Sequence, residues 1–222
     1  MELPFADAIS GYFELPTDNA RRLLPPHLEP AELHHGSSIL SVNVFDMPKS
    51  PVGAYRSVVM SVMVVPYVKG APGERLPKGA AFAYLSGTTA FMPRQIASSM
   101  FHLPHWGDNL KIDLTRDGKN ITAVVAAGKD PVLEMTVSEY EWEPAEFMYQ
   151  TFMKDGSGTY RAEVQVKGEI SEHEEETGKL VLHEHEFHGG LDIADVFDVP
   201  FREVWTRNAT QSFSPLVQIQ PT

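Results

Sequence analysis

The chain has 222 residues, of which 42% are hydrophobic and 22% charged, and this ordinary globular composition excludes wholesale disorder. Its formal charge of -12 opposes binding to nucleic acid, and the absence of cysteine excludes disulfides, thiol catalysis and thiolate metal sites. No apolar run approaches the roughly 20 residues of a membrane span, and MELPFADAIS at the N-terminus lacks the basic and apolar regions of a signal peptide. We therefore expect a cytoplasmic protein with neither nucleic acid nor membrane as partner.

The first predicted element is a short helix over residues 18–24, within one expected domain that spans residues 1–222. Thr17 and Asp18 can cap its start, and the two prolines after Leu24 end it. β-branched and apolar residues then predict a series of strands, separated by Gly- and Pro-rich turns, in residues 38–45, 57–68 and 80–87.

A second short helix is predicted over residues 94–101, and strands dominate again after it. Residues 109–127 show alternating apolar positions on both sides of an Asp-Gly turn, which indicates a β-hairpin. Three further strands are expected in residues 131–142, 158–170 and 179–188. So many strands need a closed or stacked arrangement, so we predict a β-rich α+β fold: a closed β-barrel or sandwich with a few short flanking helices.

The histidines offer candidate chemistry. If residues 179–188 form a strand, His183 and His185 lie on one face and could hold a metal ion, whereas His188 faces the other way unless the chain turns. The alternative is an exposed polar strand beside an acidic turn. His102 and His105 could act as acid and base, or could belong to a loop that closes over a sheet. The spacing favours neither a metal nor a cofactor.

Four spaced segments, taken together, resemble the acetoacetate decarboxylase superfamily. LLPPHLEP is similar to the family's early helix and Pro-rich turn, and SPVGAYRSVVMSVMV to its Gly-x-Tyr segment and the strand that follows. GTTAFMPRQIA resembles the segment that carries the family's lysines, and LDIADVFDVPFREVW resembles its closing stretch. The match keeps order and approximate spacing over most of the chain. It implies a β-rich barrel with small-molecule chemistry inside it, and a homo-oligomer.

The resemblance places Arg94 and Gln95 at the positions of two family lysines. In the family the first lysine forms a Schiff base with a β-keto acid, and the second lowers its pKa. A guanidinium stays protonated and forms no imine, and Gln95 carries no charge. Ser57 replaces the acid after Gly-x-Tyr, and the family's earlier glutamate falls near residues 42–43, where there is no acid. Acetoacetate decarboxylation through an imine is therefore not expected.

Two functions follow. The first is a diverged enzyme, lyase-like or isomerase-like, that acts without an imine on a small or medium oxo-acid, enone or lactone. Arg94 would clamp a carboxylate or enolate, Gln95 and Tyr55 would hydrogen-bond to the substrate, and His183 and His185 would complete the site. The second is a non-catalytic module that has kept the cavity, in which Arg94 anchors an anionic ligand. The alternative to both functions is that Arg94 lies at the surface and only forms an ion pair with a carboxylate.

Overall fold

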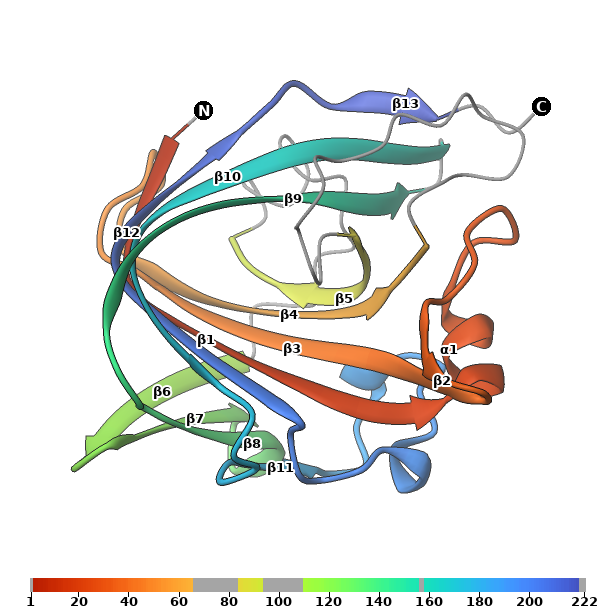
Figure 1. Ribbon diagram of the computed structural model, residues 1–222, viewed down its shortest axis with the longest axis horizontal. Helices are drawn as coiled ribbons and strands as arrows, with labels where there is room; N and C mark the ends of the chain where they lie inside the picture. The colour runs from red at the N-terminus through yellow and green to blue at the C-terminus, as the bar shows by residue number, and fades with distance from the viewer. Residues whose placement is uncertain (1, 66–83, 94–109, 156–157, 220–222) are drawn as a thin grey trace.

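The computed structural model describes residues 2–65, 84–93, 110–155 and 158–219, and most of them form two β-sheets (Figure 1). The larger sheet closes into a barrel because its first strand, β1, pairs both with β12 and with β3. Every pairing in the ring is antiparallel except that of β5 with β9. In ring order the barrel strands are β1 (Glu2–Pro16), β12 (Arg202–Phe213), β10 (Gly158–His173), β9 (Glu143–Asp155), β5 (Tyr84–Phe91), β4 (Tyr55–Met63) and β3 (Ser37–Met47).

The barrel confirms the predicted β-rich closed architecture. Two short strands extend it: β2 (Glu32–His34) pairs with β3, and β13 (Val217–Ile219) pairs with β10. Among the described residues, no helix is long and apolar enough to cross a membrane.

The second sheet packs against the outside of the barrel, and Figure 1 shows it below β1 and β3. Its order is β11 (Lys179–Leu182), β8 (Asp130–Ser138), β7 (Asn120–Ala127) and β6 (Leu110–Asp117). The β6–β7 pair is the predicted hairpin, and Gly118 at its turn has the positive φ of 59° that such turns require. The shared core joins outward-facing barrel side chains, such as Phe13, to Ile121 and Met135 of the second sheet.

In the described part of the chain, three short helical segments accompany the sheets: α1 (Thr17–Leu23), η2 (Glu186–His188) and η3 (Ile193–Asp195). The first agrees with the predicted helix, but the expected capping is wrong. Pro16 is the N-cap residue and makes no side-chain cap, while the Thr17 hydroxyl lies 3.0 Å from that of Ser38. The second predicted helix, residues 94–101, lies outside the described residues, as do His102 and His105.

Two predicted strands end earlier than expected. The strand predicted over residues 131–142 ends at Ser138, and the chain then crosses to the barrel strand β9. The strand predicted over residues 179–188 ends at Leu182, because the last part of that segment forms the η2 turn. His183 and His185 therefore do not share a strand face, and this part of the prediction is wrong.

Alternation along each barrel strand separates two environments. On β1, Ile9 and Phe13 point outward into the core shared with the second sheet, whereas Ala8, Ser10 and Tyr12 point into the barrel. On β1 the barrel therefore buries both of its faces, one against the second sheet and the other around a central space.

Gly168 lies at a register shift of β10, where this strand passes very close to β12. A Cβ atom there would lie 2.3 Å from the Cβ of Ala209, 2.8 Å from its Cα and 3.0 Å from the carbonyl oxygen of Arg207. We expect Gly168→Ala to lower the free energy of unfolding by about 1–3 kcal/mol, because backbone atoms cannot rotate out of the way. Urea denaturation measures this loss. Gly190→Ala is the control, since its Cβ would meet only a Leu23 methyl at 3.8 Å; an equal loss in both variants would contradict the prediction.

Candidate functional site

The barrel encloses a cavity of about 530 Å³, and all seven of its strands contribute side chains to the wall. This volume lies within the roughly 300–1,000 Å³ of pockets that bind small molecules. Residues that pair across neighbouring strands point to the same side of the sheet. The inward-facing residues of one such paired row form one level of the cavity wall, and successive levels follow along the strands. The two ends of the cavity differ in chemistry.

The polar end is built where β1, β3, β10 and β12 run side by side. Tyr12 pairs in register with Arg202 on one side and with Ser41 on the other. Arg202 Nη2 donates a hydrogen bond to Oε1 of Glu172, and the Tyr12 hydroxyl is hydrogen-bonded to Ser41. Burial raises the pKa of Tyr12, so this phenol stays protonated at physiological pH. Asn43 lies one level further along the cavity.

Aromatic and methionine side chains dominate the opposite end. Phe5 and Phe45 pack edge to face with ring centroids 5.9 Å apart, and Met47 pairs in register with Tyr55. Burial raises the pKa of Tyr55 to about 12. The remaining apolar members of this end include Val166 and Phe213. The cavity is therefore amphipathic, with an ion pair at one end and aromatic rings at the other.

The described part of the site contains one residue of the predicted substrate-binding set, since Tyr55 lines the cavity. Arg94 and Gln95 lie outside the described residues, although Met92, two positions earlier, contributes to the wall. Ser57 and Asn43 also line the cavity, so the positions where the family resemblance expects acids carry neutral side chains.

The predicted histidines lie elsewhere. Neither His183 nor His185 is among the described residues that line the cavity. His185 caps η2 instead, since its Nδ1 accepts the Phe187 N–H at 3.0 Å. His188 is 4% exposed, and its Nε2 donates to the carbonyl oxygens of His183 and Val132 at 3.0 and 3.2 Å. Burial lowers the pKa of His188, which favours a neutral ring. Within the described ranges, no three His, Asp or Glu side chains are placed to hold a metal ion.

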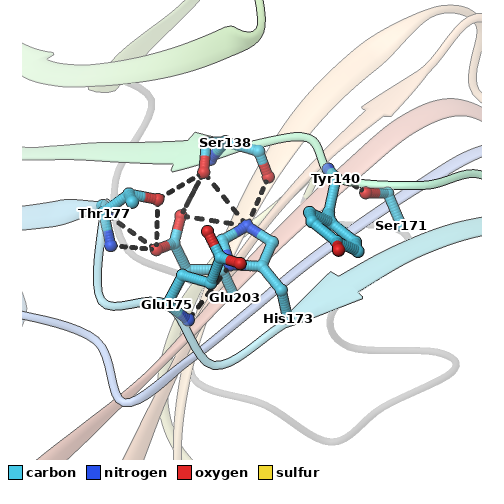
Figure 2. Close-up of polar contacts among 8 residues, drawn as sticks. Ser138, Tyr140, Ser171, His173, Glu175, Thr177 and Glu203 are labelled. Atoms are coloured by element: carbon cyan, nitrogen blue, oxygen red, sulfur yellow. Dashed lines mark hydrogen bonds and ion pairs between the residues drawn. The ribbon is translucent and has the colours of Figure 1, made fainter.

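A second polar cluster, which sequence reasoning missed, lies outside the barrel around the carboxylate of Glu203 (Figure 2). This side chain is fully buried and accepts the backbone N–H groups of Ser138, Thr177 and Gly178 at 2.7–2.8 Å. The carboxylate thus joins the end of β8, the turn after β10 and the start of β11 to the start of β12.

Ser138, His173 and Glu203 have the composition of a catalytic triad but not its geometry. In a triad the serine and the carboxylate bind opposite nitrogens of the imidazole ring. Here His173 Nε2 lies 3.0 Å from Ser138 Oγ and 3.9 Å from Glu203 Oε2, while Nδ1 accepts the Glu175 N–H at 3.3 Å. Nε2 therefore carries the proton and cannot serve as a base for Ser138. The cluster is an anchor for the chain, not a nucleophile site.

The described residues define a closed β-barrel protein with an amphipathic internal cavity and a second sheet packed outside the barrel. The sequence profile of the acetoacetate decarboxylase (ADC) family matches residues 3–189. The chain therefore belongs to the acetoacetate decarboxylase family, as the four sequence segments predicted. A comparison with curated protein sequences finds no match.

Solved structures of the same fold share little sequence with this chain. An acetoacetate decarboxylase-like enzyme from Sphingomonas wittichii RW1 aligns with a TM-score of 0.62 and 12% identity, over 100% of this chain and 93% of that one. The acetoacetate decarboxylase of Legionella pneumophila aligns at 0.60 and 15%, over 99% and 87%. The enduracididine biosynthesis enzyme MppR complexed with pyruvate aligns at 0.59 and 12%, over 100% and 91%. At identities this low, the structural alignments show a shared fold alone.

Proposed function

We propose that this protein is a diverged enzyme of the acetoacetate decarboxylase family, lyase-like or isomerase-like, that acts on a small or medium oxo-acid, enone or lactone without a lysine imine. The observation that carries the proposal is the cavity itself. Its described wall contains no lysine, but it presents Arg202, Glu172 and the hydroxyls of Tyr12 and Tyr55. The structure of MppR complexed with pyruvate supports an oxo-acid as the substrate class.

The described residues can polarise a carbonyl group without covalent catalysis. Tyr12 and Tyr55 stay protonated because burial raises the pKa of both phenols, and each can donate a hydrogen bond to a carbonyl or enolate oxygen. The apolar walls strengthen such hydrogen bonds by excluding water. Arg94 and Gln95 enter this proposal from the sequence alone, as a carboxylate clamp and a hydrogen-bonding neighbour. An anionic ligand, a homo-oligomer, a cytoplasmic location and the absence of a cofactor also belong to the proposal.

A non-catalytic binding module is the second candidate. It is favoured by the neutral side chains of Asn43 and Ser57 at the cavity wall, where the family resemblance expects acids. Both candidates require the cavity to bind a small molecule, so a ligand-induced rise in melting temperature supports either. Turnover of the bound compound separates them.

Incubation with acetoacetate and borohydride is expected to leave the mass of the protein unchanged, because Arg94 cannot form an imine and Gln95 supplies no cation to activate a lysine. Intact-mass spectrometry measures this outcome, together with carbon dioxide release that does not exceed the solvent rate. A covalent adduct mapped to one lysine, or rapid decarboxylation, would refute the imine-free chemistry.

Lysine substitutions at positions 94 and 95 test whether the cavity can regain imine chemistry. Arg94→Lys alone is expected to give no adduct, because a lysine with an ordinary pKa stays protonated at pH 7. The double variant Arg94→Lys with Gln95→Lys supplies the neighbouring cation. An adduct in the double variant alone would show that the cavity still accommodates the family's substrate.

A further inference from the structure

The ion pair at the polar end of the cavity joins two residues that differ in exposure. The Arg202 side chain is 15% exposed, whereas that of Glu172, which accepts its hydrogen bond, is 37% exposed. Both line the cavity. The guanidinium is therefore the deeper partner, and the carboxylate lies nearer to solvent.

The backbone that carries Arg202 is anchored at the start of β12. The next residue, Glu203, points to the opposite side of β12 and is fixed by three backbone N–H groups outside the barrel. This anchor holds the start of β12 and thereby aims the Arg202 side chain into the cavity. Glu172 precedes the last residue of β10 and is exposed. The guanidinium is the deeper member of the pair, and the carboxylate is the one that borders on water.

Two further acidic residues belong to the described wall of the cavity. Glu143 and Glu146 line the cavity from β9 but are exposed, and Glu146 accepts a hydrogen bond from Gln165 at 2.6 Å. Beside Arg202, Tyr12 presents a second hydrogen-bond donor at the same level of the barrel. From there the wall becomes apolar through the levels of Phe45 and Met47.

We propose that Arg202 anchors the carboxylate of an amphipathic oxo-acid, and that Glu172 is an internal counter-ion which this carboxylate displaces. The inference rests on the proposed function for the location of the ligand inside the barrel. The exchange keeps the guanidinium neutralised: the ligand's carboxylate replaces that of Glu172, which turns to solvent. A planar guanidinium suits either carboxylate. The Tyr12 hydroxyl then donates to the neighbouring keto oxygen, and the apolar body of the acid lies along Phe45 and Met47.

Three compounds that share a phenylalkyl group test the proposal by isothermal titration calorimetry. They are 2-oxo-4-phenylbutyrate, 4-phenylbutan-2-one, which lacks the carboxylate, and 4-phenylbutylamine, which carries the opposite charge. The unmodified protein is expected to bind the oxo-acid most tightly. Arg202→Met is expected to weaken oxo-acid binding at least tenfold and to leave ketone binding unchanged. Glu172→Gln is expected to strengthen oxo-acid binding several-fold, because no internal carboxylate has to be displaced.

The matched controls are Arg21→Met and Glu29→Gln, which alter an Arg–Glu ion pair outside the cavity. Neither is expected to change the affinity for any probe. Glu172→Gln leaves Arg202 in place and tests the exchange separately if Arg202→Met fails to fold.

Several outcomes would overturn the proposal. Equal affinity for the oxo-acid and the ketone, or weaker oxo-acid binding in Glu172→Gln, would exclude Arg202 as the anchor while leaving the proposed function intact. Amine binding that is lost in Glu172→Gln would assign the anchor to Glu172 instead. If none of the three probes binds, this proposal fails, and the proposed function is then judged separately by ligand-induced shifts in melting temperature and by turnover of the bound compound.

Discussion

Glu203→Leu is expected to lower the free energy of unfolding by about 3–5 kcal/mol, one of the two largest effects we predict. Leucine is similar in size but accepts no hydrogen bond, so the backbone N–H groups of Ser138, Thr177 and Gly178 lose their partner, and that of Gly178 does so in a fully buried place. The substitution also releases the contact by which four chain segments are joined. Gly178 is closely packed here, because a Cβ on it would lie 2.5 Å from the carbonyl oxygen of Thr136 and 2.8 Å from the Glu203 carboxylate.

Urea denaturation followed by tryptophan fluorescence measures the loss in Glu203→Leu. Glu169→Leu on the neighbouring strand β10 is the control, since this carboxylate is bound by the side chains of Arg207 and Asn208 near the surface. Exposed ion pairs contribute about 0–1 kcal/mol, so the control is expected to change little. Equal effects in the two variants would show that the buried cluster does not stabilise the fold.

Phe13→Ala is expected to lower the free energy of unfolding by about 3–5 kcal/mol, because it removes a large, fully buried side chain between the barrel and the second sheet. The ring covers Gly11 on the same strand: a Cβ there would lie 2.6 Å from the ring and 3.2 Å from the Sδ of Met135. The cost therefore includes both lost burial and a cavity.

The same denaturation experiment measures the effect of Phe13→Ala. Phe197→Ala is the control, since that ring is 63% exposed and its removal leaves no cavity. A loss below about 1 kcal/mol in Phe13→Ala would mean that the two sheets do not depend on each other's packing.

Local sequence patterns were sufficient to predict elements that have one buried and one exposed face. The β6–β7 hairpin was predicted because apolar residues alternate on both sides of Asp117-Gly118, and its strands bury one face against the barrel. The short helix was predicted because Pro25 and Pro26 must end it.

Three barrel strands, β1, β9 and β12, were not predicted. Each contributes polar side chains to the cavity wall, such as Tyr12, Glu143 and Arg202, so polar residues lie on the inner as well as the outer face of these strands. On β12, Arg202 points into the cavity, whereas Glu203 is fully buried on the opposite face. A local pattern assigns both residues to solvent.

The candidate site was predicted only where a family segment passes through it. Tyr55 follows from the Gly-x-Tyr resemblance, and the structure places it at the cavity wall. Tyr12 and Arg202 gave no signal, because they lie at opposite ends of the sequence and meet only through the pairing of β1 with β12. The histidine prediction assumed a strand that ends before His183.

The sequence by itself determined the family, the β-rich class of fold and the replacement of the two family lysines by Arg94 and Gln95. These follow from residue identity and order along the chain, which need no knowledge of distant contacts. Only the tertiary structure decided which side chains share the cavity and that Arg202 faces Glu172 across its polar end. The physical reason is barrel closure: the register between strands far apart in sequence sets which residues meet, and no local pattern encodes that register.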